Sequence, residues 1–340
     1  MKRVVTFGEL MLRLAPNGYY RFFQNDQMQA TFGGAEANTA VSLANYGLDS
    51  VYVTKLPEHA IGQAALDSLR YFGVDISKTV RGGDRVGIYF LEKGASQRGS
   101  VCIYDRAHSA IAEACPTDFD WDTIFEGADW FHFTGITPAL GGNMLEICLE
   151  ACKAAKERGI TVSFDPNYRA KLWSVEQAAQ TMEQICVYVD VLIVNENQAQ
   201  ELFDIQIPEK YRNGDETDDE GYLFLCQDLH KRFGCRFVAL SERRTYSATL
   251  NRICAKLYDG KEFYSSKQYK VDIIDRVGGG DALDGGLIFA LLDGRNSKNA
   301  IEFATAASAL KHSVEGDYNR VSVSEVEKLF EGGSNARVQR

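Results

Sequence analysis

Short apolar runs alternate with longer segments of helical periodicity along nearly the whole chain. The first apolar run, at Val4–Gly8, predicts a buried strand, and Ala35–Tyr46 carries small apolar residues on one stripe, as an amphipathic helix does. Further strands are predicted from the apolar runs at Trp130–Thr134, Ile160–Phe164, Val189–Val194 and Phe237–Leu240. Several runs are apolar at successive positions, so both of their faces are expected to be buried. The pattern therefore predicts an α/β fold with a doubly wound, mainly parallel sheet and helices on both faces.

Two stretches break this rhythm. Leu12–Phe32 and Gly87–Tyr104 alternate apolar and polar residues without a helical period. The alternation predicts strands of a small β-sheet that stands apart from the main sheet as a lid, at about residues 12–32 and 86–106. The last ten residues, 331–340, are rich in Gly and polar side chains and are expected to form a flexible tail.

Composition narrows the class of protein. The 340 residues are 45% hydrophobic and 25% charged, which is typical of a folded globular chain. Lys and Arg total 37 against 47 Asp and Glu, and the resulting net charge of −10 argues against a nucleic-acid-binding surface. No run of 18 uncharged apolar residues is present, so no membrane span is expected.

The eight cysteines favour a cytoplasmic location. They form no C-x-x-C pair, as expected of reduced and mostly buried thiols, and the first residues lack the apolar core of a secretion signal. Cys148 and Cys152 lie one helical turn apart, but no His or second Cys pair lies near them in the sequence. Core packing is therefore favoured over a metal site, and no protein-held metal is predicted.

The stretch with the clearest chemistry follows an apolar run at Val271–Ile274. Three consecutive glycines, Gly278, Gly279 and Gly280, precede Asp281 and an apolar helix. Backbone N–H groups at such a helix start are unpaired and favour an anion, with support from the helix dipole. From these residues alone, Asp281 is either a helix cap or a general base. The loop lacks the Gly-Lys-Ser/Thr of a Walker A motif and the glycine spacing of a dinucleotide-binding turn.

Two other polar clusters are candidates for ligand contacts. Gly33–Asn38 opens the first long helix, where it is either a tight helix start or a place where a ligand approaches the backbone. Asp165–Arg169 follows an apolar strand, and ligands of open α/β sheets bind at the carboxyl ends of strands. Arg169 offers a two-pronged donor for a carboxylate or phosphate, or it forms a surface ion pair.

Together these blocks resemble the ribokinase-like (PfkB) carbohydrate kinases, and within them the branch that phosphorylates 2-keto-3-deoxygluconate. The glycine loop with Asp281 is typical of the whole family, whereas the Gly-Ile-Thr-Pro-Ala-Leu and Asn-Tyr-Arg-x-x-Leu-Trp blocks indicate the branch. The resemblance is carried by Gly33–Asn38, Tyr104–Arg106, Ser109 with Ala110, Phe131–Leu140, Asp165–Arg169, Leu172 with Trp173, and Asp275–Asp281. It implies a single ribokinase-like kinase domain over residues 1–330, with the lid described above.

The resemblance implies ATP-dependent phosphorylation of the terminal hydroxyl of 2-keto-3-deoxygluconate, with Mg²⁺ carried by the nucleotide. It assigns the catalytic base to Asp281 and the anion hole to Gly278, Gly279 and Gly280. It assigns sugar contacts to Gly34, Asn38, Tyr89, Tyr104, Arg106 and Arg169. It assigns nucleotide contacts to Asn167, Asn195, Ser241, Gly278 and Gly280. The expected partners are a small sugar acid and ATP, with a homo-oligomer formed through the lid.

The nucleotide side departs from the family pattern. Where the family often has Thr-x-Gly-x-x-Gly, this chain has Arg243 and Tyr246 in place of the two glycines. We therefore expect side chains to meet the nucleotide, for example by ring stacking on Tyr246 or a phosphate contact from Arg243. Asn195–Gln198 lacks the last Glu of the family's Asn-x-x-Glu motif, and Leu283-Asp284 stands where a Phe and a small residue are usual.

Two alternatives stay open at this point. The first is another sugar kinase of the family, such as a fructokinase or ribokinase. The second is a noncatalytic sugar-binding relative whose nucleotide site is spoiled by Arg243 and Tyr246. The retained Asp281 beside three glycines favours a kinase, and the presence of both Arg106 and Arg169 favours an acid sugar over a neutral one.

Overall fold

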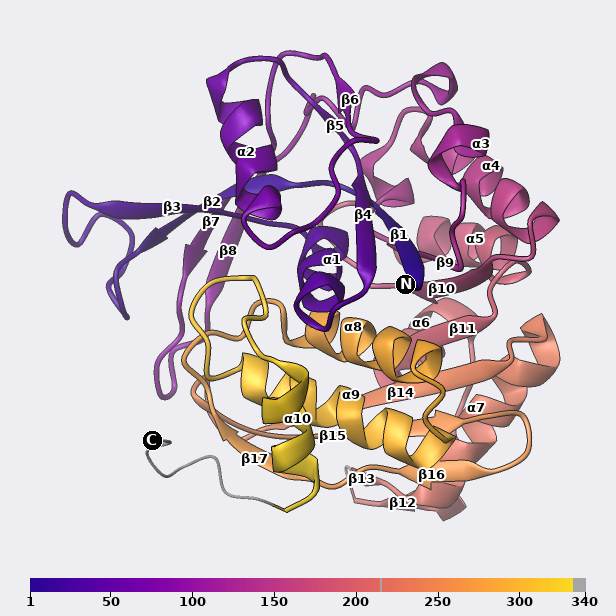
Figure 1. The fold of residues 1–340 in the computed structure, drawn as a ribbon. Helices are drawn as coiled ribbons and strands as arrows, with labels where there is room; N and C mark the ends of the chain where they lie inside the picture. The colour runs from indigo at the N-terminus through magenta and orange to yellow at the C-terminus, as the bar shows by residue number, and fades with distance from the viewer. Residues whose placement is uncertain (215, 333–340) are drawn as a thin grey trace.

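The computed structural model describes residues 1–214 and 216–332, which form a large sheet between two helical layers and a smaller sheet to one side (Figure 1). The strand order of the large sheet is β16-β15-β14-β11-β10-β9-β1-β4, and β17 also pairs with β15. Its parallel strands are β1 Arg3–Phe7, β4 Asp49–Val53, β9 Trp130–Thr134, β10 Thr161–Asp165, β11 Val191–Asn195 and β14 Phe237–Thr245. Its antiparallel strands are β15 Leu250–Tyr258, β16 Phe263–Ser265 and β17 Tyr269–Asp272.

Helices cover both faces of the large sheet, so β9 is buried along its whole length. One layer holds α4 Met144–Glu157, α5 Val175–Cys186, α6 Glu196–Phe203 and α7 Asp219–Phe233, with the short α3 Trp121–Ile124. The other layer holds α1 Ala35–Asn45, α8 Gly279–Leu292, α9 Ser297–Lys311 and α10 Val323–Phe330. In this second layer, the rings of Tyr46, Phe289 and Phe303 pack together and join α1, α8 and α9.

The remaining short elements lie around this frame. They are α2 Ala60–Arg70, β5 Lys55–Leu56, β6 Val80–Arg81, β12 Arg212–Asn213, β13 Glu216–Thr217, and 3-10 turns at Pro116–Asp118, Pro138–Leu140 and Glu209–Tyr211. No helix among the described residues is both long enough and apolar enough to cross a membrane.

The smaller sheet has the order β3-β2-β7-β8 and projects from the body of the molecule (Figure 1). Its strands are β2 Met11–Pro16, β3 Met28–Gly33, β7 Ile88–Glu92 and β8 Val101–Asp105. They fall within the two stretches whose sequence alternates between apolar and polar residues. Tyr89 and Leu91 of β7 are buried, whereas Ile103 of β8 is 50% exposed.

The mainly parallel sheet, the helices on its two faces and the separate small sheet confirm the fold class predicted from the sequence. Glu331 and Gly332 form a turn after α10, and the rest of the predicted tail, residues 333–340, lies outside the described residues. Because β4 lies on one side of β1 and β9 on the other, the order of strands reverses at β1. The loops after the strands diverge at such a point and leave a crevice for ligands.

Candidate active site

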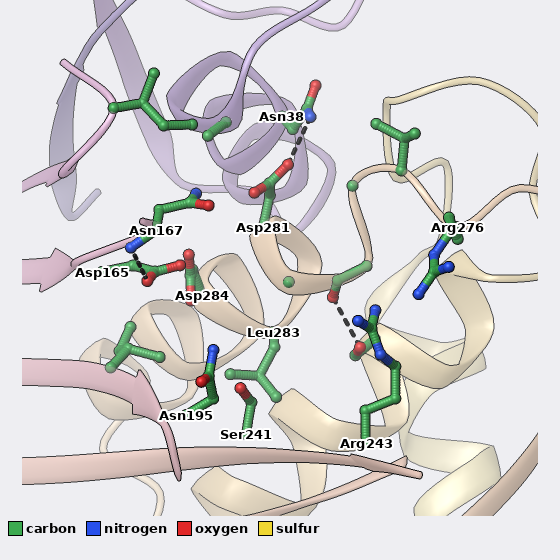
Figure 2. A pocket seen from close by; sticks show the side chains of 18 of the residues that line it. Asn38, Asp165, Asn167, Asn195, Ser241, Arg243, Arg276, Asp281, Leu283 and Asp284 are labelled. Atoms are coloured by element: carbon green, nitrogen blue, oxygen red, sulfur yellow. Dashed lines mark hydrogen bonds between the residues drawn. The ribbon is translucent and has the colours of Figure 1, made fainter. Parts of the chain in front are cut away.

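A pocket of about 660 Å³ lies between the carboxyl ends of the parallel strands, the starts of α1 and α8, and the small sheet (Figure 2). Every residue to which the family resemblance assigned a catalytic, sugar or nucleotide contact lines this pocket. These residues are Gly34, Asn38, Tyr89, Tyr104, Arg106, Asn167, Arg169, Asn195, Ser241, Gly278, Gly279, Gly280 and Asp281. The fold therefore brings the predicted base, sugar contacts and nucleotide contacts to a single cavity.

The glycine loop begins α8, and its surroundings explain why glycine stands there. Gly278 is the N-cap of α8 with a φ of 80°, a conformation that side chains disfavour. A Cβ on Gly278 would lie 2.2 Å from the carbonyl oxygen of Asp317, and a Cβ on Gly279 would lie 2.4 Å from the His312 ring. Gly280 faces open space. The loop is therefore tightly packed on its inner side, and the first amides of α8 can meet an anion at the pocket.

Asp281 lies in the first turn of α8 and directs its side chain toward α1 (Figure 2). Its Oδ2 accepts a hydrogen bond of 2.6 Å from Nδ2 of Asn38. The N-cap position belongs to Gly278, so the interpretation of Asp281 as a helix cap is wrong. Burial raises the pKa of Asp281 to about 6, although the Asn38 hydrogen bond and the Arg169 charge oppose the rise. A carboxyl group with this pKa is mostly ionised at neutral pH and can accept a proton.

Asn38 joins α1 to α8 at the pocket. Its Oδ1 accepts a hydrogen bond of 3.4 Å from the Gly34 N–H, which leaves Nδ2 to donate to Asp281. Asn38 is only 3% exposed, so its orientation is fixed by the protein. A Cβ on Gly34 would lie 2.0 Å from the carbonyl oxygen of Glu9. Glycine is therefore needed at position 34 because two backbone segments approach each other closely.

A buried ion-pair network ties the small sheet to the glycine loop. Arg13 of β2 donates to Asp317 at 2.6 Å and to Asp275, which precedes the loop, at 2.5 Å. The hydroxyl of Tyr89 also donates to Asp317, at 2.5 Å, so this hydroxyl is already engaged within the protein. The sequence analysis missed Arg13 and Asp317, because a contact between residues 304 positions apart leaves no local signal.

The two arginines predicted to hold a sugar carboxylate have different surroundings. Arg106 is 8% exposed, its Nε lies 3.2 Å from Oε2 of the buried Glu9, and its guanidinium lies 4.5 Å from the centre of the Tyr104 ring. Arg169 is exposed and donates to two backbone carbonyls of its own loop. It forms no ion pair within residues 1–214 and 216–332, although its charge acts on Asp281. Arg169 is therefore the more available of the two for an anionic ligand.

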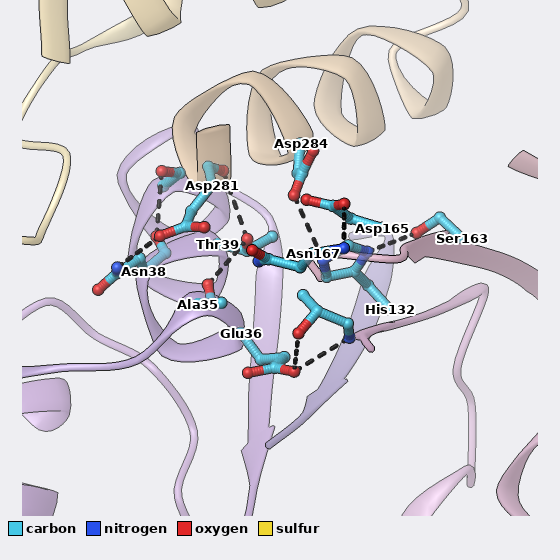
Figure 3. Close-up of polar contacts among 12 residues, drawn as sticks. Ala35, Glu36, Asn38, Thr39, His132, Ser163, Asp165, Asn167, Asp281 and Asp284 are labelled. Atoms are coloured by element: carbon cyan, nitrogen blue, oxygen red, sulfur yellow. Dashed lines mark hydrogen bonds and ion pairs between the residues drawn. The ribbon is translucent and has the colours of Figure 1, made fainter. Parts of the chain in front are cut away.

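A second carboxyl group lies one turn beyond Asp281 on α8. Asp284 is 1% exposed and lies beside Asp165, which ends β10 (Figure 3). Its Oδ2 has no hydrogen-bond partner, and it lies 3.9 Å from Nε2 of His132, which is also unpartnered. Burial lowers the pKa of His132 to about 3, so the imidazole is neutral. Burial and the neighbouring Asp165 raise the pKa of Asp284, and burial raises that of Asp165 to about 7.

The turn after β10 presents Asp165 and Asn167 to the pocket. Oδ1 of Asp165 accepts a hydrogen bond of 2.7 Å from the Asn167 N–H, and Asn167 has a φ of 40°. Asn is among the few side chains that tolerate this left-handed conformation. No group of three or more His, Cys, Asp or Glu side chains arranged to hold a metal ion occurs among the described residues.

At the end of the pocket where the sequence analysis expected the nucleotide, the altered Asn195–Gln198 motif forms a helix cap. Oδ1 of Asn195 accepts from the Gln198 N–H at 3.0 Å, and Oε1 of Gln198 accepts from the Asn195 N–H at 2.9 Å. This reciprocal pair is the capping box of α6. Of the two residues that replace the family's glycines, Arg243 lines the pocket, whereas Tyr246 lies outside the pocket lining and is 49% exposed.

The fold and the glycine loop at the start of α8 are those of a protein that binds a phosphorylated ligand. The sequence pattern of the pfkB family carbohydrate kinases matches residues 1–323, and the chain belongs to this family. A 2-dehydro-3-deoxygalactonokinase from Haloferax volcanii is 33% identical over 97% of this chain and 97% of its own length. A 2-dehydro-3-deoxygluconokinase from Bacillus subtilis is 28% identical over 92% of this chain and 90% of its own length.

Solved structures extend the similarity to three dimensions. The crystal structure of a 2-dehydro-3-deoxygluconokinase from Thermotoga maritima superimposes with a TM-score of 0.93 and 46% identity, covering 97% of this chain and 98% of that one. A PfkB family carbohydrate kinase from Listeria grayi superimposes with a TM-score of 0.90 and 34% identity, covering 97% and 100% of the two chains. The prediction of a ribokinase-like sugar kinase is confirmed, and ATP is the phosphoryl donor that this family implies.

Proposed function

We propose that this kinase phosphorylates the terminal hydroxyl of 2-keto-3-deoxygluconate with ATP, giving the 6-phosphate. The observation that carries the proposal is Arg169, a guanidinium without an ion pair among the described residues in the same pocket as Asp281. A sugar acid supplies the missing carboxylate, whereas a neutral sugar leaves the charge unpaired. The names of the relatives from Bacillus subtilis and Thermotoga maritima, which refer to the same sugar acid, support this choice.

Asp281 is the proposed general base for the sugar hydroxyl. Asn38 fixes its Oδ2, and a pKa of about 6 keeps the carboxylate ionised at neutral pH while it can still accept a proton. The amides of the loop Gly278–Gly280 are proposed to hold the oxygens of the transferring phosphoryl group. Phosphoryl transfer requires alignment and charge neutralisation more than covalent participation of the protein, and this pocket provides groups for both.

The proposed sugar contacts come from three directions. Gly34 and Asn38 at the start of α1 meet the hydroxyls, because backbone and amide groups can both donate and accept. Arg169, from the turn after β10, meets the carboxylate, and Arg106 adds a second positive charge from the small sheet. Tyr104, which contacts Arg106, and Tyr89, which is hydrogen-bonded to Asp317, complete the wall that the lid contributes.

The nucleotide is proposed to bring Mg²⁺ into the pocket next to Asp165 and Asp284. These two carboxyl groups face each other, and Oδ2 of Asp284 has no hydrogen-bond partner among the described residues (Figure 2). Mg²⁺ keeps several waters and is commonly bound through one or two carboxylates plus substrate phosphates, so this pair fits it. When bound, the ion neutralises phosphate charge. Asn167, Asn195 and Ser241 are the other proposed contacts on the nucleotide side.

The small sheet is also the proposed surface for a homo-oligomer. β8 is one of its two edge strands, and Val101 and Ile103 on it are 39% and 50% exposed. An exposed apolar edge strand is a ready surface for pairing with a second copy. Ile103→Glu is expected to convert a dimer to a monomer in analytical ultracentrifugation, and a wild-type chain that is monomeric at all concentrations would contradict the assignment. We propose a cytoplasmic location, because the donor is ATP and the cysteines are unpaired.

A coupled assay with ATP and a panel of sugars tests the substrate. The panel contains 2-keto-3-deoxygluconate, its galacto epimer, fructose and ribose, the last two because fructokinases and ribokinases belong to the same family. We expect kcat/KM for the two sugar acids to exceed that for the neutral sugars by about 100-fold, the effect of a charge-assisted hydrogen-bonded pair that a neutral sugar cannot form. Equal use of fructose would favour the fructokinase alternative. Sugar binding without turnover of any of the four would favour a noncatalytic relative.

A further inference from the structure

Two arginine side chains on the proposed nucleotide side have no hydrogen-bond or ion-pair partner among the described residues. Arg243 of β14 and Arg276 of the glycine loop line the pocket, and their guanidinium groups point toward each other (Figure 2). No carboxylate of residues 1–214 and 216–332 forms an ion pair with either group. Arg243 is exposed and Arg276 is half-buried. Partial desolvation in the pocket lowers the pKa of both groups, and the positive charges of Arg276 and Arg169 lower the pKa of Arg243 further, to about 10. Guanidinium groups keep their charge at neutral pH, so the two repel each other.

The neighbouring arginines of the β14–β15 hairpin, in contrast, are paired with acids. Arg244 comes next on β14 and forms an ion pair with Glu216. Arg252 on the paired strand β15 lies 3.1 Å from Glu242 and 3.3 Å from Glu216. Glu216 of β13 and Glu242 of the hairpin itself thus neutralise Arg244 and Arg252, whereas no acid among the described residues pairs with Arg243. In a chain with a net charge of −10, unpaired cations that converge on one cavity indicate an anionic ligand.

The arginines also lie near the anion-binding amides. Arg276 precedes Gly278 by two positions, and the His312 ring packs against Gly279. Burial is the main cause that lowers the pKa of His312 to about 4, and the charges of Arg243 and Arg276 contribute to it. The charges of both guanidinium groups are therefore felt at the N-terminus of α8. Tyr246, the ring expected to stack on the base, lies outside the pocket lining.

We propose that Arg243 and Arg276 form a phosphate clamp that, together with the amides of the glycine loop, binds the triphosphate of the donor. Each guanidinium can donate two parallel hydrogen bonds to phosphate oxygens, and a triphosphate carries enough charge to satisfy both. The donor is then selected by its polyphosphate chain more than by its base. The inference rests on the proposed function, since it takes this pocket to be the nucleotide site of a sugar-acid kinase.

Calorimetric binding of inorganic tripolyphosphate tests the clamp without a base, a sugar or turnover. Arg243→Met and Arg276→Met keep the apolar stem of each side chain and remove its charge. We expect each variant to weaken tripolyphosphate binding about tenfold or more, and the double variant about 100-fold or more. Arg244→Met is the matched control, because Arg244 is adjacent on the same strand but lies outside the pocket lining. The affinity of this variant for tripolyphosphate is expected to stay within about twofold of the wild-type value.

Unchanged tripolyphosphate affinity in Arg243→Met and Arg276→Met would overturn the clamp. If the double variant does not fold, the two single variants carry the test. Comparable kcat/KM values for ATP, GTP and ITP in the wild-type enzyme are expected, and a preference for ATP above about 100-fold would contradict selection by the triphosphate. If the clamp is correct but the proposed function is wrong, tripolyphosphate binding will still depend on both arginines, whereas 2-keto-3-deoxygluconate will not be phosphorylated.

Discussion

The proposed sugar side and the proposed nucleotide side of the pocket differ in whether their polar side chains have partners within the protein. On the sugar side, Asn38 is hydrogen-bonded to both Gly34 and Asp281. Arg106 forms an ion pair with Glu9, and the Tyr89 hydroxyl is hydrogen-bonded to Asp317. On the nucleotide side, the guanidinium groups of Arg243 and Arg276 have no ion pair among the described residues, and Oδ2 of Asp284 has no hydrogen-bond partner. The sugar side is therefore preorganised by the protein, whereas the nucleotide side leaves charge for a ligand to neutralise.

This difference separates groups that set geometry from groups that bind. A side chain paired within the protein is oriented before the substrate arrives, and its removal disturbs both structure and chemistry. A charged group without a protein partner can complete its interactions with the ligand, so its removal should weaken binding more than folding. Arg169 is the exception on the sugar side, because it is the cation there that has no acidic partner within residues 1–214 and 216–332. The sugar carboxylate is accordingly assigned to Arg169.

The largest effect is expected for Asp281→Asn. The amide keeps the size of the carboxylate but cannot accept the hydroxyl proton, so kcat should fall about 10²–10⁴-fold or more. Sugar affinity, measured by calorimetry, should stay within about threefold, because that variant changes the base rather than the carboxylate contact. A kcat within threefold of the wild-type value would remove Asp281 from the role of base.

The next effect is on stability and concerns Arg13. Its side chain is 4% exposed, and Arg13→Met leaves the carboxylates of Asp275 and Asp317 buried without their partner. The free energy of unfolding in denaturant should fall by about 3–5 kcal/mol. Arg70→Met is the control, because Arg70 is 62% exposed and pairs with an exposed Asp67, so a loss of at most about 1 kcal/mol is expected. Equal losses in both variants would show that the buried network does not hold the small sheet to the loop.

A smaller effect separates the two arginines of the sugar side. Arg106→Ala removes the partner of buried Glu9, so it should lower the free energy of unfolding and raise KM for the sugar acid together. Arg169→Ala should raise KM about 10- to 100-fold with little change in stability, because Arg169 is exposed and pairs with no protein acid within the described residues. Equal losses in the free energy of unfolding for Arg169→Ala and Arg106→Ala would contradict the distinction between the unpaired Arg169 and the paired Arg106.

The smallest effect is a shift in pH dependence. Asp281 must be ionised to act as base, so kcat/KM should rise with pH and level off above about 6, the pKa to which burial raises this group. The positive charge of Arg169 lowers the pKa of Asp281, so Arg169→Ala should move the acid limb of the profile to higher pH. The profile is measured at saturating ATP for both enzymes. An acid limb that moves to lower pH in Arg169→Ala would contradict the claim that the Arg169 charge lowers the pKa of Asp281.

The sequence predicted the features that depend on local pattern. Apolar runs predicted β1, β9, β10, β11 and the first part of β14, but β4, β15 and β16 of the large sheet were not predicted. Alternation predicted the small sheet, and the glycine loop with Asp281 lies at the start of a helix as expected. Pairings between distant residues could not be predicted, because they depend on how the layers pack. Arg13 with Asp317, Arg106 with Glu9, and the position of Tyr246 outside the pocket lining are of this kind. Asp284 was recognised as a departure from the family, but its place beside Asp165 needed the fold.

The most direct test of the account compares 2-keto-3-deoxygluconate with 3-deoxyfructose, in which a hydroxymethyl group replaces the carboxylate. Wild-type enzyme should prefer the acid by about 100-fold in kcat/KM, the effect of one charge-assisted hydrogen-bonded pair. In Arg169→Ala the preference should fall to about tenfold or less, mainly through weaker use of the acid. Equal use of both sugars by the wild-type enzyme, or an undiminished preference in Arg169→Ala, would contradict the claim that an unpaired charge marks the ligand.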